Sequence, residues 1–221
     1  MEALILYFVL FFPRMTDASF SILIPMAETI PFSILRELSR SLTYTLPSLA
    51  LIWYLLSSKK GFFALKTEKP QLRDLYSLAA GLPGLILIGL GISSLELLFQ
   101  GYEGITLPPK VEAPVNTIGW IVMVISCLGT GYLEESYFRY YLLTTLEKLL
   151  PQAVFRVILS TVLFSLCHVY EGPWGILNAV LAGILLSLLF VRFRSLHGIA
   201  LAHGAYNIFV YTMGNFGTPA V

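Results

Sequence analysis

The sequence predicts an all-α fold, a polytopic transmembrane helix bundle with about seven spans, six and eight being the alternatives. Two observations predict it. Of the 221 residues, 57% are hydrophobic and only 12% are charged, whereas a soluble domain carries about 25% charged residues. Several apolar runs also approach the roughly 20 residues that a transmembrane helix needs. The small share of charged residues excludes an ordinary soluble enzyme. The formal net charge of only +1 excludes a nucleic-acid binder with a basic face.

The apolar runs give the expected elements in chain order. Residues 1–35 predict one irregular or kinked membrane segment followed by an interfacial piece, because Pro13, Arg14 and Asp17 interrupt the first apolar stretch. Since backbone groups in lipid must be satisfied within the segment, the later runs must be helices. These later runs cover about 41–57, 74–99, 116–146, 153–170, 174–191 and 197–214.

Loop charges predict the orientation of a multi-pass integral membrane protein. The loop from Ser57 to Asp74 is the most basic, and basic loops lie preferentially in the cytoplasm. Alternation then places 148–156 and 192–197 on the cytoplasmic side, and 101–114 and 171–173 on the outer side. The basic residues of the first loop are Lys59, Lys60, Lys66, Lys69 and Arg73.

Ionisable residues inside the apolar runs are the informative positions, because such residues are costly in lipid and usually face a cavity or a partner. Glu134, Glu135 and Arg139 lie well inside the run 116–146. On a helix Glu135 and Arg139 are four residues apart and share a face, which predicts an ion pair. Glu134 points about 100° away and has no such partner on its own helix, so it is the candidate general base. The alternative is that all three charges snorkel to the cytoplasmic surface.

Two further groups follow on separate predicted helices. Phe164 and His168 end the run 153–170, and His203 and Asn207 are spaced to share one helical face beside the small residue Gly204. A histidine at a helix end is also typical of an interfacial anchor. A His–Asn pair is also typical of a hydrogen bond between membrane helices.

Together the three groups supply a base, a second proton carrier and two donors for an oxyanion. This set suits hydrolysis of an amide by an activated water. It is also nearly a zinc site, which uses two histidines and a carboxylate with one open position. Spacing alone leaves both chemistries open.

The ordered motifs resemble those of the CPBP family of intramembrane proteases, which comprises CAAX proteases and bacteriocin-processing enzymes and is also called Abi or Rce1-type. The resemblance covers about residues 115–212 and includes Glu134-Glu135-x-x-x-Arg139, Phe164-x-x-x-His168 and His203-x-x-x-Asn207. It implies an intramembrane endopeptidase, CAAX prenyl protease 2-like, that hydrolyses a peptide bond of a membrane-associated protein or peptide. Lipidated substrates are included, since eukaryotic relatives trim prenylated CAAX proteins.

The resemblance also implies a role for each catalytic residue. Glu134 would activate the attacking water with His168 assisting, while His203 and Asn207 would hold and polarise the scissile carbonyl. The cavity around them is expected to open toward the cytoplasm, because water and a soluble substrate tail need a route to it.

Glu135, Arg139 and Phe164 complete the motifs and are expected to support the site. The family is labelled metalloprotease, but its Rce1-type members are also described as glutamate-dependent. No His-Glu-x-x-His helix is present in this sequence. We therefore expect no metal, with zinc dependence as the alternative. The ligands of a zinc ion would be Glu134, His168 and His203.

The sequence divides into residues 1–114, with N-terminal membrane helices and the basic cytoplasmic loop, and 115–214, a CPBP-like catalytic core, within one integral membrane domain. The expected partners are the substrate and membrane lipid, and no nucleic acid. Two non-catalytic functions compete with the protease. A transporter would need inverted repeats, which the sequence lacks, and an immunity scaffold would not need Glu134.

Overall fold

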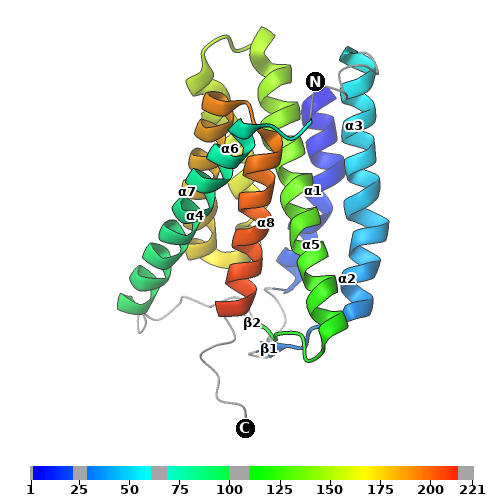
Figure 1. The fold of residues 1–221 in the computed structure, drawn as a ribbon, viewed down its shortest axis with the longest axis vertical. Helices are drawn as coiled ribbons and strands as arrows, with labels where there is room; N and C mark the ends of the chain where they lie inside the picture. Colours follow the sequence, from blue (N-terminus) through cyan, green and yellow to red (C-terminus); the bar gives the residue numbers. More distant parts are fainter. Residues whose placement is uncertain (1, 22–28, 61–68, 100–109, 214–221) are drawn as a thin grey trace.

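A computed structural model describes residues 2–21, 29–60, 69–99 and 110–213, and the statements below refer to these residues. The prediction of an all-α bundle is confirmed. Seven helical segments of the described chain run lengthwise, alternately up and down (Figure 1). The strands β1 (Thr29–Ile30) and β2 (Lys110–Val111) form a short parallel pair at one end. We call this the β end and the opposite one the basic-loop end.

The helices follow the predicted runs with shifted boundaries. The first half of the chain contains α1 (Glu2–Ser21), α2 (Ile34–Arg40), the π-helix η1 (Ser41–Thr45), α3 (Leu46–Lys60) and α4 (Leu72–Leu98). The second half contains α5 (Thr117–Glu135), the π-helix η3 (Ser136–Leu143), the 3₁₀ turn η4 (Leu146–Lys148), α6 (Ala153–Leu166), the 3₁₀ turn η5 (Val169–Glu171), α7 (Gly172–Phe193) and α8 (Leu196–Met213).

Within the described residues, three helices are long and apolar enough to cross a membrane: Leu72–Leu98, Thr117–Lys148 and Val169–Phe193. Two shorter apolar helices cover Glu2–Phe12 and Ala153–Leu166. These helices support an integral membrane protein, and the figure of about seven spans stays a prediction.

The N-terminal segment corrects the expectation of an irregular piece. The helix α1 runs through Pro13 to Ser21. Proline is tolerated within membrane helices because neighbouring groups can satisfy the freed carbonyl. The helices α2, η1 and α3 likewise follow one another without a break, so Pro47 lies inside a continuous helical segment, directly after the π-helix η1.

The loops predicted to be cytoplasmic meet at the basic-loop end. Glu147 Oε1 accepts a hydrogen bond from Arg194 Nη2 at 2.7 Å and forms an ion pair with Arg156 Nη1 at 2.9 Å. The Ser195 hydroxyl donates to Asp74 Oδ1 at 2.5 Å. These contacts join the starts of α4, α6 and α8 to the end of α7, as the predicted grouping of these loops requires. Lys66 and Glu103, which belong to the predicted loops, lie outside the described residues.

An aromatic core joins α1 to the second half of the chain. The Phe11 ring packs against Tyr137 and Phe138, with centroids 5.0 and 4.8 Å away. The Tyr137 hydroxyl donates to the Ala3 carbonyl at 2.6 Å, and the Tyr7 hydroxyl donates to a carbonyl of α6 at 3.0 Å. The first helix is therefore bound into the same core as η3 and α6.

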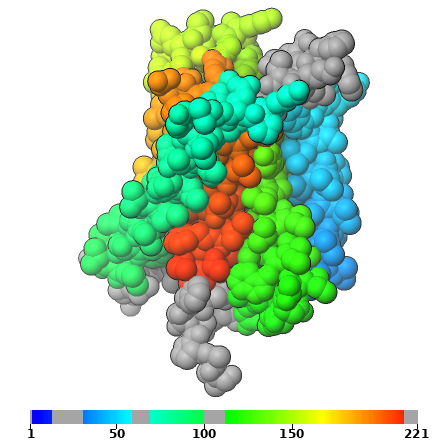
Figure 2. Space-filling view, in the orientation of Figure 1, coloured from blue at the N-terminus to red at the C-terminus, as the bar shows by residue number. Residues whose placement is uncertain are grey.

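Glycines set the position of α8 between α4 and α5, which Figure 2 shows on one face of the molecule. A Cβ on Gly131 of α5 would stand 2.7 Å from the Ala200 carbonyl oxygen and from the Gly204 nitrogen of α8. A Cβ on Gly81 of α4 would stand 3.0 Å from the Ala202 Cβ. Small residues allow membrane helices to approach this closely, and the α5–α8 crossing lies beside the predicted site.

Candidate active site

The predicted ion pair between Glu135 and Arg139 is present and fully buried. Arg139 Nη1 donates to Glu135 Oε1 at 3.0 Å, and its Nη2 donates to the Gly183 carbonyl of α7 at 3.3 Å. The pair lies where α5 passes into η3. A π-helical turn inside a helix often marks a functional site.

His203 of α8 lies against both glutamates. Its Nδ1 is 2.8 Å from Glu135 Oε1, and its Nε2 is 3.8 Å from Glu134 Oε2. A carboxylate accepts hydrogen bonds, so Nδ1 carries a hydrogen and donates it. Glu134 and His203 are only 3% and 6% exposed. Glu134 therefore has a partner from another helix, which spacing along α5 does not indicate.

Phe164 of α6 lies at the centre of the three motifs. The Arg139 guanidinium stands over its ring at 4.4 Å from the centroid. The rings of His168 and His203 lie 4.6 and 6.0 Å from it, centroid to centroid. A cation over an aromatic face is stabilising, more so when desolvated. Phe164 thus brings together side chains of α5–η3, α6 and α8.

His168 lies just beyond the C-terminal end of α6. The helix α6 ends at Leu166, and His168 precedes the turn η5. Gly172 then adopts a positive φ of 74°, a conformation that favours glycine. His168 Nδ1 is 2.8 Å from the Phe164 carbonyl oxygen. Because a carbonyl only accepts, Nδ1 carries the hydrogen, and in the neutral ring Nε2 is left as an acceptor.

Asn207 lies one turn beyond His203 on α8 and is half-buried. No hydrogen bond of its side chain is found within the described part of the chain. Its amide therefore keeps two N–H donors for a ligand. Of the four residues predicted to be catalytic, Glu134, His203 and His168 are linked by direct contacts or through Phe164, and Asn207 follows on the same helix as His203.

Comparison with known proteins supports the resemblance that these motifs carry. Residues 116–209 match the family model described as Type II CAAX prenyl endopeptidase Rce1-like. The matched segment contains all three motifs and spans α5 to α8. Over this segment the chain is similar to the CAAX protease family. No curated protein and no solved structure matches it. Members of this family are proteases, and three apolar helices support a place in the membrane.

A zinc site needs three or four histidine, cysteine or carboxylate ligands grouped around one point. In the described ranges, no three His, Cys, Asp or Glu side chains are grouped to hold a metal ion. His203 Nδ1 is bound to Glu135, and His168 Nδ1 is bound to a carbonyl. These hydrogen bonds leave Nε2 of both histidines open, as in histidines that bind zinc, but Glu134, His168 and His203 do not form such a group in the described residues, and we derive no step through a zinc ion.

A second, partly buried polar cluster lies on α2 and α5, and the sequence analysis missed it. Arg40 Nη2 donates to Glu37 Oε2 and to Ser126 Oγ, both at 2.6 Å, and Nη1 donates to Thr130 Oγ1 at 3.3 Å. The sequence did carry a signal for this cluster. Glu37 and Arg40 are three residues apart and directly precede the apolar run 41–57. Only the fold shows that these two residues lie beside the segment that matches the family model.

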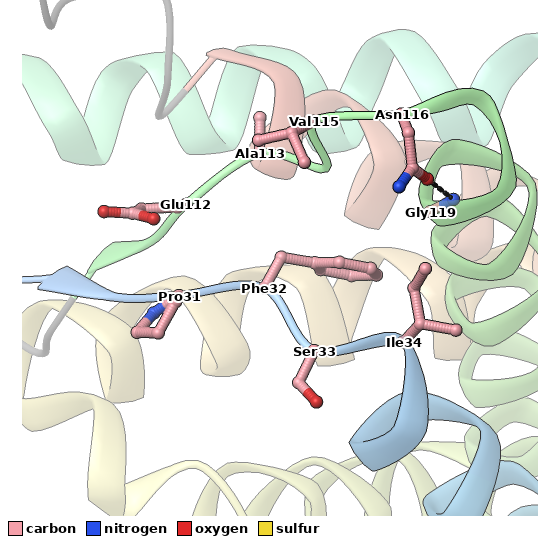
Figure 3. Close-up of a pocket in the computed structure, with 9 residues that line it drawn as sticks. All are labelled: Pro31, Phe32, Ser33, Ile34, Glu112, Ala113, Val115, Asn116 and Gly119. Carbon is pink, nitrogen blue, oxygen red and sulfur yellow. Dashed lines mark hydrogen bonds between the residues drawn. The ribbon is translucent and has the colours of Figure 1, made fainter.

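A cavity of about 440 Å³ lies at the β end, away from the motifs (Figure 3). Phe32, Glu112 and Asn116 are among its lining residues, and Asn116 Oδ1 caps α5 by accepting from the Gly119 N–H at 2.8 Å. Gly119 precedes Glu134 by fifteen residues, which is about 22 Å along a helix. This cavity is separate from the candidate active site.

Proposed function

We propose that the chain is an intramembrane endopeptidase that hydrolyses a peptide bond of a membrane-associated, CAAX-type protein or peptide. The observation that carries the proposal is His203, buried and in contact with Glu135 at 2.8 Å and Glu134 at 3.8 Å. Glu134 is the proposed base, and the amide of Asn207 and His203 Nε2 are the proposed carbonyl-binding donors.

The net charge of the buried cluster, which consists of Glu134, Glu135, Arg139 and His203, favours one additional proton shared between Glu134 and His203. Glu134, Glu135 and Arg139 together carry one net negative charge, and burial of uncompensated charge is costly. One additional proton makes the cluster neutral. With His203 Nδ1 facing Glu135, this proton lies on the side of Nε2 and Glu134. When His203 holds it, Glu134 is an ionised carboxylate beside a donor.

In the proposed reaction, Glu134 takes a proton from water while the water oxygen bonds to the scissile carbonyl carbon. His168 Nε2 accepts a hydrogen bond from the same water, which its ring allows because Nδ1 is bound to a carbonyl. His203 and Asn207 donate to the oxyanion. Glu134 then returns the proton to the leaving nitrogen as the C–N bond breaks, which yields a carboxylic acid and an amine, and transfer of the acid's proton to the amine gives a carboxylate and an ammonium.

Glu135, Arg139 and Phe164 support this site without reacting. Glu135 fixes the ring of His203, and Arg139 balances the charge of Glu135. The Phe164 ring packs against Arg139 and both histidines. We further propose that residues 115–214 form the catalytic core and 1–114 the accompanying membrane helices. The site would open toward the basic-loop end, since His203 is only about 10 Å along α8 from Leu196.

The test compares Glu134→Gln with the wild type on a fluorogenic peptide that carries a farnesylated cysteine, with the protein in lipid vesicles. Loss of a general base lowers the rate by about 100-fold or more. Glu96→Gln makes the same chemical change near the end of α4 and should leave the rate unchanged. An unprenylated peptide of the same sequence tests whether the lipid is required.

Thermal unfolding in detergent shows whether each variant is folded. A folded Glu134→Gln protein that hydrolyses at the wild-type rate would overturn the glutamate mechanism. A folded wild type that cleaves neither peptide would favour the transporter or the scaffold.

A further inference from the structure

Polar side chains continue from the candidate active site along α5. Glu134, Thr130 and Ser126 are spaced four residues apart, so they lie on successive turns of one helical face. The next contacts after Glu134 come from α2, because Arg40 donates to both Thr130 and Ser126. Glu37 completes the cluster through Ser126 Oγ, which donates to its carboxylate at 2.6 Å.

The facing helix carries a matching series. His203, Asn207 and Tyr211 are also four residues apart, and α8 runs antiparallel to α5 (Figure 1). Tyr211 lies within electrostatic range of Glu37 and Arg40. A line of polar groups therefore leads from Glu134 and His203 to the Arg40 guanidinium, between helices whose outer faces are apolar.

Arg40 has donors left over after its contacts inside the protein. A guanidinium has five N–H groups, and Glu37, Ser126 and Thr130 accept from its two terminal nitrogens. Its Nε is buried and has no hydrogen-bond partner within the described residues. A buried donor without an acceptor costs free energy, which a bound ligand with an acceptor would recover.

The ligand that suits these donors is a carboxylate. Guanidinium groups form charge-assisted hydrogen bonds with carboxylates. Arg40 already makes one with Glu37 at 2.6 Å, and the donors that Glu37 does not use could bind a second carboxylate. A peptide always brings one carboxylate, at its C-terminus. We propose that Arg40 binds the C-terminal carboxylate of the substrate, which deepens and rests on the proposed peptidase function.

The distance makes this binding compatible with cleavage at Glu134. Thr130 and Glu134 are one helical turn apart, with about 6 Å between their Cβ atoms. An extended peptide covers roughly 3.4 Å per residue. A carboxylate held at Arg40 therefore places the peptide bond a few residues from the C-terminus beside Glu134, and the released piece is short.

The experiment uses two farnesylated fluorogenic peptides of one sequence, one ending in a free acid and one in an amide. Their only difference is the terminal charge, so acidic side chains elsewhere in the peptide cannot produce a preference. The full-length wild type in vesicles should cleave the acid at least tenfold more efficiently, measured as kcat/KM. Arg40→Gln should cleave both peptides at the rate of the amide, and Arg40→Lys should retain part of the preference.

Two control variants separate carboxylate binding from a structural role of Arg40. Arg36→Gln removes the same charge from an exposed position one turn away on α2 and should keep the preference. If Arg40 only neutralises Glu37, the double variant Glu37→Gln, Arg40→Gln regains the preference for the acid, and the proposal is wrong. Continued absence of the preference in a folded double variant supports it.

Equilibrium binding of the same peptides to Glu134→Gln separates this proposal from the proposed hydrolysis. Equal cleavage of acid and amide by the wild type overturns the role of Arg40 and leaves the peptidase standing. Arg40-dependent binding of the acid without any cleavage supports Arg40 and overturns the peptidase. Absence of both binding and cleavage overturns both.

Discussion

The crossing of α5 and α8 can be tested at Gly131. The substitution Gly131→Ala adds one methyl group whose carbon would lie 2.7 Å from the Ala200 carbonyl oxygen and the Gly204 nitrogen. Ordinary contact begins at 3.4 Å. Both opposing atoms belong to the backbone, which cannot change rotamer as a side chain can. The two helices must therefore separate by about 0.7 Å, the difference between 2.7 and 3.4 Å.

A separation of this size is enough to break the contact at the candidate active site. The distance between His203 Nδ1 and Glu135 Oε1 would increase from 2.8 Å to about 3.5 Å, which is outside hydrogen-bond range. Overpacking costs about 1–3 kcal/mol, and a lost hydrogen bond to a charged group costs about 1.5–3 kcal/mol. We expect a stability loss of about 2–4 kcal/mol and at least a tenfold fall in hydrolysis, since catalytic groups displaced by 1 Å lose about 100-fold.

Thermal unfolding in detergent measures the first effect, and cleavage of the farnesylated peptide measures the second. The matched control is Gly91→Ala in α4, where an added Cβ meets nothing within 4 Å. That change should stabilise the protein slightly, because alanine favours a helix over glycine. Equal stability and activity of Gly131→Ala and Gly91→Ala would refute the role of the crossing.

Three further substitutions or treatments have defined outcomes. Arg139→Gln leaves the Glu135 carboxylate buried without its cation and should cost about 3–5 kcal/mol in thermal unfolding, and the double variant Glu135→Gln, Arg139→Gln should be more stable than the single one. Cys167→Ser should keep the hydrolysis rate within about twofold, because a buried thiol that donates to the Leu163 carbonyl is poorly reactive. A larger loss of rate would indicate a cysteine mechanism. A metal chelator should leave hydrolysis unchanged, and a loss that zinc restores would revive the metal-dependent alternative.

Local rules were sufficient for part of the fold and of the site. The hydropathy of the runs predicted where helices form, and the four-residue spacing predicted the Glu135–Arg139 pair. Both depend on neighbours within one segment, which the sequence displays directly. The boundary of α6 is less exact, since the helix ends at Leu166 and the turn η5 follows within the apolar run that extends to residue 170.

Contacts between helices were not predictable in the same way. Spacing grouped His203 with Asn207, its neighbour on α8, whereas the contact that positions the ring comes from Glu135 on α5. Which residues of two helices meet depends on where their backbones can approach, and here the glycines at 131 and 204 determine it. Arg40 was missed for the same reason, since its partners lie about 90 residues away in the chain.

The hydrogen bonds from Tyr7 and Tyr137 have a consequence for how the family segment is defined and used. Sequence similarity begins at residue 116, but the aromatic interior includes side chains of the first dozen residues. The segment that matches the family model is therefore shorter than the part of the chain that shares this core. An excised 116–209 fragment would expose the surface that α1 covers and lose the hydrogen bonds that α1 makes with Tyr137, Tyr141 and the Leu163 carbonyl. A minimal active unit is therefore expected to retain the N-terminal helix.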